Sequence, residues 1–193
     1  KKLVMRLFLS WKHIISLCCV LVYLISSLAH ATVVPKQHRL LIINSYNEGA
    51  PWSQTLITPI MLQTSSIEDV NADLVHINGT FIRNDSLYNQ MEEGIFQRYE
   101  RNKPDYLVLI GSIAFTLRDR IQKEWGDIPM VLIANEDTYA PREYYFTGRS
   151  KNMEDNTVAP LNDIREQYNF TFIEAPDMYK ETIDMMVRML PPM

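Results

Sequence analysis

The chain has 193 residues, of which 47% are hydrophobic and 22% are charged, and its formal net charge is -4. This is the composition of a globular protein of one or two domains, and it excludes a disordered chain, a fibrous repeat and a disulfide-dense miniprotein. The acidic balance also disfavours nucleic acid as a partner, because a nucleic-acid-binding domain needs a basic face. We therefore expect the partner to be a small molecule or another protein.

The first part of the chain has the pattern of a secretory signal. Basic residues precede an apolar run at residues 14–28, which is followed by Ala29, His30 and Ala31. A positive start, an apolar run and small residues at the cleavage point are the parts of an export signal. The run is shorter than the ~20 apolar residues that a spanning helix needs. We predict a signal peptide at residues 1–31 and a mature domain at residues 32–193, with an uncleaved membrane anchor as the alternative.

The cysteine positions point to the compartment of the predicted mature domain. Both cysteines, Cys18 and Cys19, lie inside the apolar run, so the mature domain has none. A disulfide, a catalytic thiol and a cysteine-ligated metal are therefore excluded there. An exported domain of this size without cysteine suits a bacterial periplasm better than an animal secretory pathway. We expect the domain to lie on the periplasmic side of the inner membrane of a bacterium.

Short apolar runs alternate with helical patterns along the rest of the chain. The runs predict buried strands, which we expect at residues 39–44, 73–77, 106–110, 129–134 and 170–173. Apolar residues spaced by three or four predict helices, which we expect at residues 54–66, 86–101, 113–125 and 179–190. Because Pro59 lies inside the first of these helical segments, we expect that helix to begin near it.

This alternation predicts the fold. Strands that alternate with helices indicate βαβ units, so we expect an α/β fold with a doubly wound parallel sheet and helices on both faces. The stretch at residues 136–169 departs from the pattern, because it is long for a connection and has only a weak strand signal at residues 144–146. We expect this stretch to be an excursion over the surface.

The loops after the predicted strands are the places to look for a site, since ligands of open parallel sheets bind outside the carboxyl ends of the strands. These loops carry no G-x-G-x-x-G, no P-loop and no G-x-S-x-G motif. The four histidines have no metal-ligand spacing. Glu136 and Asp137 follow the fourth strand. They are a weak candidate for a catalytic acid pair, and the alternative is that they belong to a solvated loop. We predict no catalytic residue, no metal and no cofactor in this chain.

The same loops carry side chains suited to a small polar ligand. Tyr46 and Trp52 follow the first strand, together with Ser45 and Ser53. An aromatic ring can cover an apolar face of a ligand while hydroxyls fix its orientation. Trp52 has an equal alternative role, as a core residue at the edge of the sheet.

The end of the third strand offers a second kind of contact. Ser112 follows Gly111 and opens a predicted helix, whose free N–H groups would favour a carboxylate or a phosphate. The alternative is that Ser112 is an ordinary helix cap. The candidate ligand-binding residues at the strand ends are therefore Ser45, Tyr46, Trp52, Ser53, Gly111, Ser112, Asn135 and Glu136.

Several segments resemble a known family. LLIINSY at residues 40–46 with PWS at residues 51–53, DYLVLIGS at residues 105–112, and IPMVLIAN at residues 128–135 are similar to periplasmic sensor domains of bacterial two-component histidine kinases, including hybrid ones. Those domains are related to type I periplasmic solute-binding proteins. KETIDMMVRMLP at residues 180–191 resembles the helix that precedes the second lobe of that fold. The Asn-Ser-Tyr with the Trp-Ser is the most specific part.

The resemblance implies that this chain is the first lobe of a ligand-sensing domain. A family member continues into a second α/β lobe, a membrane helix and phosphotransfer domains, and it holds a small polar ligand between its lobes. The expected partners are therefore this ligand and the second lobe, membrane and kinase regions of the parent protein. The open face of a single lobe could also pair with a second copy. A substrate-binding protein of an ABC-type importer is the alternative function, and a small periplasmic α/β enzyme is a third.

Overall fold

The computed structural model describes residues 37–146 and 158–175 of the chain. The described residues all belong to one compact unit. The expected signal at residues 1–31 and the expected helix at residues 179–190 lie outside the described residues. Among the helices of the described part, none is long and apolar enough to cross a membrane.

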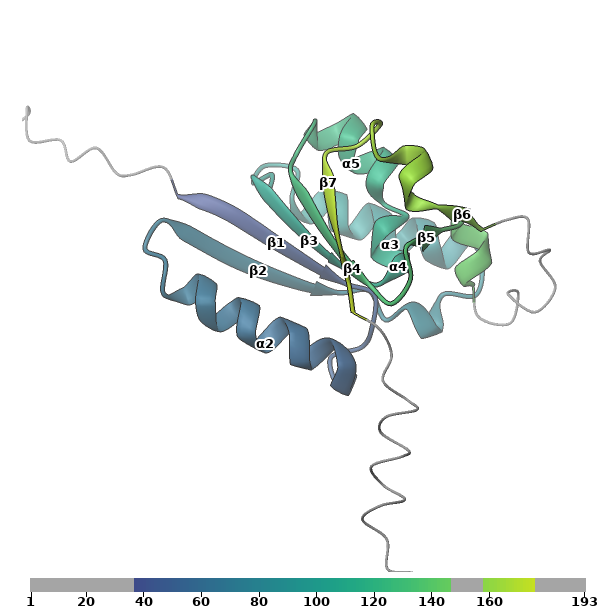
Figure 1. Ribbon diagram of the computed structural model, residues 1–193. Helices are drawn as coiled ribbons and strands as arrows, with labels where there is room; N and C mark the ends of the chain where they lie inside the picture. Colours follow the sequence, from purple (N-terminus) through teal and green to yellow (C-terminus); the bar gives the residue numbers. More distant parts are fainter. Residues whose placement is uncertain (1–36, 147–157, 176–193) are drawn as a thin grey trace, which may run out of the picture. The chain divides into compact units, whose positions relative to one another are not determined.

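Five parallel strands form the central sheet (Figure 1). They are β1 (His38–Asn44), β2 (Val70–His76), β3 (Tyr106–Ile110), β4 (Met130–Ala134) and β7 (Phe170–Glu174). Their order across the sheet is β2-β1-β3-β4-β7, and every neighbouring pair is parallel. The five expected strands and the α/β fold are thereby confirmed, with small shifts at the strand ends.

The strands are nearly continuous apolar runs because both faces of the sheet are covered. On β1, Leu41 and Ile43 pack against one cluster of buried residues, while Ile42 between them packs against the other. All three side chains are at most 1% exposed. A strand with only one buried face would alternate apolar and polar residues instead.

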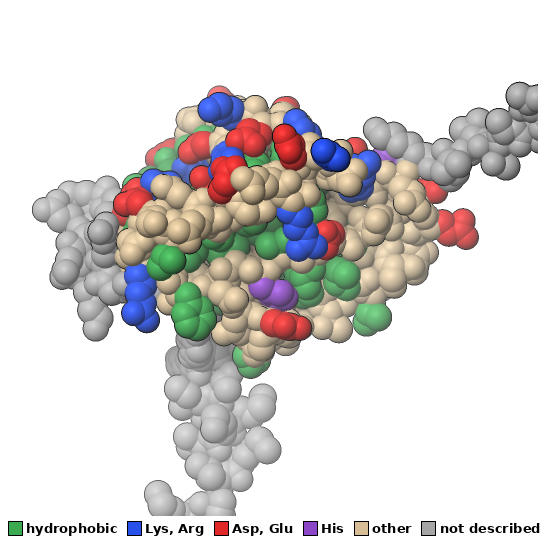
Figure 2. Space-filling view, turned by 180° about the vertical axis from the view of Figure 1, so that it is seen from behind, with side chains coloured by type: hydrophobic (Ala, Val, Ile, Leu, Met, Phe, Trp, Pro, Cys, Tyr) green, Lys and Arg blue, Asp and Glu red, His purple; other side chains and the backbone are tan. Residues whose placement is uncertain are grey.

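Helices form a layer on each face of the sheet (Figure 1). The helices α3 (Asp85–Arg98), α4 (Ser112–Phe115) and α5 (Arg118–Trp125) pack on the face of Leu41 and Leu109. On the other face, α2 (Pro51–Ser65) packs against Ile42 and Val108. Seen from behind, charged side chains gather on the upper part of the molecule, at the level of α5 (Figure 2).

The start of α2 corrects one expectation. The helix begins at Pro51 and continues through Pro59, so the expected start near Pro59 is wrong. Proline fits the first position of a helix, because its missing N–H would have no partner there and its fixed φ angle is helical. The helix expected at residues 113–125 is divided into α4 and α5, which are separated by Thr116 and Leu117.

The excursion after β4 consists of short elements. The strands β5 (Thr138–Tyr139) and β6 (Ala159–Pro160) form an antiparallel pair, and 3-10 helices lie at η2 (Arg142–Tyr145) and η5 (Leu161–Ile164). The weak strand signal at residues 144–146 does not correspond to a strand, because the N–H of Tyr144 donates to the carbonyl of Pro141 in a helical turn. The excursion also does more than cross the surface, since its buried side chains belong to the core on the α3 side: Phe146, Leu161 and Ile164.

The central position of β3 leads to a stability prediction. Leu109 is 0% exposed, so Leu109→Ala should lower the free energy of unfolding by about 2–5 kcal/mol through the lost contacts and the cavity. Leu87 on α3 is 41% exposed, and Leu87→Ala should change it by no more than about 0.5 kcal/mol. Urea denaturation of the unit Gln37–Met193 measures both, and equal effects would contradict the assignment of the core.

Candidate functional site

The strand order creates a crossover point between β1 and β3. The chain leaves β1 toward β2 on one side, and it leaves β3 toward β4 on the other. In sheets of this order, the crevice outside the carboxyl ends of the two strands is the usual ligand site. Ser45 and Tyr46 follow β1, and Gly111 and Ser112 follow β3. The strand order therefore brings four of the candidate residues together at the crossover.

Ser45 joins the two strand ends. Its side chain is buried, and its Oγ accepts a hydrogen bond from the N–H of Ala114 in α4 at 2.8 Å. The N–H of Ser45 donates to the carbonyl of Ile110, and its carbonyl accepts from the N–H of Gly79, both at 2.8 Å. The Ser45 hydroxyl is thus the cap of α4. The alternative role of Ser112 as the cap is wrong, because the cap position is Gly111 and Ser112 is the first residue of α4.

Two glycines allow the backbone to approach Ser45 closely. Gly111 has a φ of 83° and a ψ of 160°, a conformation that is essentially restricted to glycine. A Cβ atom on it would lie 2.8 Å from the Oγ of Ser45 and 2.9 Å from Cε2 of Tyr46. On Gly79, a Cβ would lie 2.2 Å from Cδ1 of Ile113 and 3.0 Å from the carbonyl oxygen of Ser45. The sequence analysis missed Gly79, whose only signal is its place after a strand.

A buried polar network holds the loop after β1. Asn44 is 0% exposed, and its Nδ2 lies 3.2 Å from Ser53 Oγ, 2.9 Å from His76 Nδ1 and 3.3 Å from the carbonyl oxygen of Tyr46. Its Oδ1 accepts the N–H of Tyr46 at 3.3 Å. Ser53 is also fully buried, and its hydroxyl donates to the carbonyl of Ala50 at 3.1 Å. Ser53 therefore positions the loop instead of facing a ligand.

Tyr46 and Trp52 form an aromatic pair at the crossover. Their rings meet edge to face, with centroids 5.3 Å apart and an angle of 63° between the planes. Both side chains are half-buried, and both pack against the core cluster that lies between the sheet and α2. Trp52 is thus partly a core residue, and its ring is not fully buried, so its predicted role at a ligand stays a prediction.

Asn135 and Glu136 lie at the end of β4, next to the crossover. The N–H of Gly111 donates to the carbonyl of Ile133 at 2.8 Å, which joins the ends of β3 and β4. Asn135 is half-buried and Glu136 is exposed, and a carboxylate oxygen of Glu136 accepts from the hydroxyl of Thr138 at 3.3 Å. These two residues extend the same edge by one strand.

The excursion reaches the end of β3 through Tyr145. Its hydroxyl accepts the N–H of Ala140 at 3.1 Å and is hydrogen-bonded to the side chain of Ser112. Burial raises the pKa of the Tyr145 hydroxyl, against the opposing effect of the bond to Ser112. The Ser112 side chain is therefore engaged with the excursion. Nothing in the sequence pattern pointed to Tyr145 as its partner.

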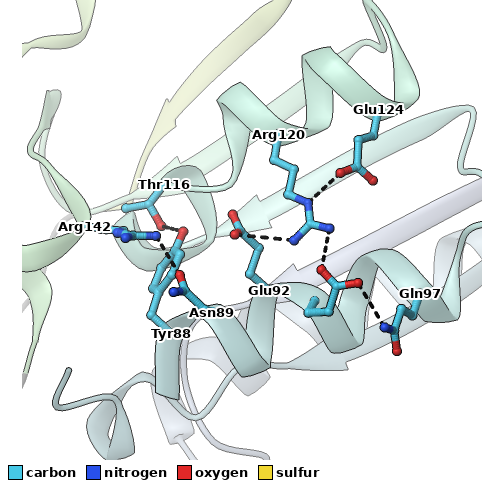
Figure 3. Close-up of polar contacts among 9 residues, drawn as sticks. Tyr88, Asn89, Glu92, Gln97, Thr116, Arg120, Glu124 and Arg142 are labelled. Atoms are coloured by element: carbon cyan, nitrogen blue, oxygen red, sulfur yellow. Dashed lines mark hydrogen bonds and ion pairs between the residues drawn. The ribbon is translucent and has the colours of Figure 1, made fainter. Parts of the chain in front are cut away.

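A second polar region joins α3 and α5 (Figure 3). The Arg120 guanidinium contacts Glu92 at 3.4 Å, and it contacts Glu93 and Glu124 at 2.7 Å each. Nearby, the Tyr88 hydroxyl lies 2.7 Å from Oγ1 of Thr116, and burial raises the pKa of Tyr88 to about 12. Because these groups are paired with one another, we interpret the region as a clasp between helices. Within the described ranges, no group of three or more metal-ligating side chains is placed to hold a metal ion.

Comparisons with protein-family models, with curated proteins and with solved structures found no match for this chain. The geometry of the carboxyl edge and the residues on it therefore carry the functional interpretation.

Gly111 and Gly126, which both have positive φ angles, provide a matched test of the crossover. Gly126 has a φ of 95° like Gly111, but a Cβ on it would meet nothing within 4 Å. Gly126→Ala should therefore cost only the backbone strain, about 1–3 kcal/mol. Gly111→Ala should cost clearly more, because its Cβ also collides with Ser45 and Tyr46. Thermal unfolding of both variants measures this, and an equal loss would show that the strand ends are not tightly packed.

Proposed function

We propose that this chain is the first lobe of an extracytoplasmic ligand-sensing domain of a two-component sensor histidine kinase, and that it binds a small polar molecule at the crossover of β1 and β3. The observation that carries the proposal is the half-buried aromatic pair of Tyr46 and Trp52 at that point. Binding sites for small molecules combine accessible apolar planes with a few well-held polar groups. The buried network around Asn44 holds the loop that carries both rings.

The polar groups at the crossover favour binding over catalysis. A nucleophilic serine needs an accessible hydroxyl with a general base in hydrogen-bond reach. Ser45 and Ser53 are both buried, and their hydroxyls serve α4 and the loop after β1. Their engagement in structure supports a ligand-binding lobe over the periplasmic enzyme that the sequence left as a third possibility.

The sensor assignment rests on the resemblance of residues 40–46 and 51–53 to sensor domains, and on the export pattern at the start of the chain. In a two-lobed sensor, closure on the ligand would bias a two-state arrangement that is passed through the membrane. A binding protein of an importer would use the same edge. The coding sequence after Met193 separates the two, because a membrane-spanning helix and kinase motifs mark the sensor, whereas a stop after a second lobe marks the binding protein.

Tryptophan fluorescence can test the site directly. In the unit Gln37–Met193 the tryptophans are Trp52 and Trp125, and Trp125 lies on the opposite face against Phe96. With Trp125→Phe, the remaining Trp52 should respond to at least one member of a panel of amino acids, hexoses and dicarboxylates. We expect millimolar affinity, because one lobe cannot supply the 70–90% coverage of a closed site, and about 4 kcal/mol of lost contact weakens binding roughly a thousandfold.

The matched control is Trp52→Phe, in which only the fluorescence of Trp125 is observed. This fluorescence should not change when the same compounds are added. A response from Trp125 alone would place binding on the wrong face. Silence of Trp52 toward the whole panel would contradict a ligand site at the crossover. Micromolar or tighter binding in calorimetry would contradict the one-lobe interpretation.

A further inference from the structure

The helix α2 is free of charge on every side. No Asp, Glu, Lys or Arg occurs between Gly49 and Ile67, a stretch that contains the whole of α2, and the nearest charged residues are Glu48 before it and Glu68 and Asp69 after it. The helices on the opposite face are rich in charge, with Asp85, Glu92, Glu93 and Arg98 on α3, and Arg118, Asp119, Arg120, Lys123 and Glu124 on α5. A helix that faces water normally carries charged residues on its outer side. The outer side of α2 therefore differs from the helices on the opposite face, because it has no charged side chain.

The outer side of α2 also exposes large apolar side chains. Leu62 is 66% exposed, and Ile67 in the turn after the helix is 50% exposed. Thr55, Thr58 and Pro59 are exposed on the same helix. The inner side is already occupied, because five α2 side chains belong to or pack against the core cluster on that side of the sheet: Trp52, Leu56, Ile57, Ile60 and Met61. We call the outer set, Thr55, Thr58, Pro59, Leu62 and Ile67, the α2 face.

Several hydroxyls on and after α2 donate to carbonyls of the same helix. Thr55 donates to the carbonyl of Trp52 at 2.6 Å, and Ser65 donates to the carbonyl of Leu62 at 2.8 Å. Ser66, which follows the helix, donates to the carbonyl of Gln63 at 2.6 Å. A hydroxyl whose proton is bound in this way loses little when water is removed from it. The hydroxyl of Thr55, which lies on the α2 face, can therefore be buried against another protein at little cost.

The absence of charge favours one partner in particular. In a two-fold symmetric dimer, the same patch lies on both sides of the contact, so any net charge on it faces a like charge. Interface cores are also depleted in charged residues. We propose that the α2 face is a dimer interface, on which α2 of a second copy of this chain packs about a two-fold axis. This proposal is independent of the proposed function, because the α2 face excludes the strand ends.

The interface would lie on the same helix as Trp52, one member of the aromatic pair. Trp52 is the second residue of α2, and Leu62 follows it ten positions later, which corresponds to about 15 Å along a helix. A shift of Trp52 would therefore move the contact between the two copies.

Sedimentation velocity of the unit Gln37–Met193 tests the proposal. The unchanged protein should sediment as a dimer at micromolar concentration. Leu62→Glu should weaken the dimer at least about a hundredfold, because carboxylates from both copies would be buried without partners. Phe81→Glu is the matched control, since Phe81 is 65% exposed but lies after β2. This variant should remain dimeric, and the far-ultraviolet circular dichroism of both variants should match that of the unchanged protein.

A cross-link supplies a second readout that does not depend on a charged variant. The unit Gln37–Met193 has no cysteine, so Thr58→Cys introduces a single thiol near the middle of α2. Oxidation should join two copies through it, while Gln90→Cys on the charged face should give monomer only. The proposal would be overturned if the unchanged protein were a monomer or if Leu62→Glu remained a dimer. It would equally be overturned if only Phe81→Glu dissociated the dimer, or if Thr58→Cys gave no cross-link in a dimeric sample.

Discussion

The hydrogen bond from the N–H of Ala114 to the hydroxyl of Ser45 holds together two parts of the chain on which the carboxyl edge depends. It joins the end of β1 to the start of α4 across 69 positions of sequence, in a buried place. A buried N–H that loses its partner costs about 1–3 kcal/mol. Gly111 and Gly79 approach this serine so closely that neither has room for a Cβ. The crossover of the sheet is therefore one tightly packed junction.

This junction fixes the position of the aromatic pair. Tyr46 follows Ser45 directly, and its backbone is held by the buried Asn44. Trp52 then lies on the first turn of α2, with Ser53 turned inward to the same network. The proposed binding site is thus a loop and a helix start that are held by buried polar groups, with the two rings half-buried against the core. The uncharged α2 face continues from this point along the same helix.

Much of the fold could be predicted because burial leaves a direct signal in the sequence. The strands are covered on both faces, so they are continuous apolar runs, and β3 was expected with the bounds that it has. The rule that ligands bind at strand ends also drew attention to Ser45 and Gly111, and the strand order, which the sequence did not predict, brings them together across the 65 residues that separate them. The predicted start of α2 near Pro59 is wrong, because the proline at the first position of the helix is Pro51.

The remaining features depend on contacts between distant residues, for which a single sequence has no local signal. The link from Asn44 to His76 crosses from β1 to β2, and the bond between Tyr145 and Ser112 joins the excursion to α4. Ser53 was expected to face a ligand because it follows an aromatic residue in a loop. The structure gives it a different role, since helix geometry turns its hydroxyl toward Ala50 and Asn44.

Amide hydrogen exchange at Ala114 tests most directly whether Ser45 holds the crossover. In Ser45→Ala, the Ala114 amide should lose most of its protection, while the strand amide of Leu109 should keep its own. Ser53→Ala, which also removes a buried serine hydroxyl at the same edge, should leave Ala114 protected. Undiminished protection of Ala114 in Ser45→Ala would contradict the account, because the end of β1 and the start of α4 would then be held together by other contacts.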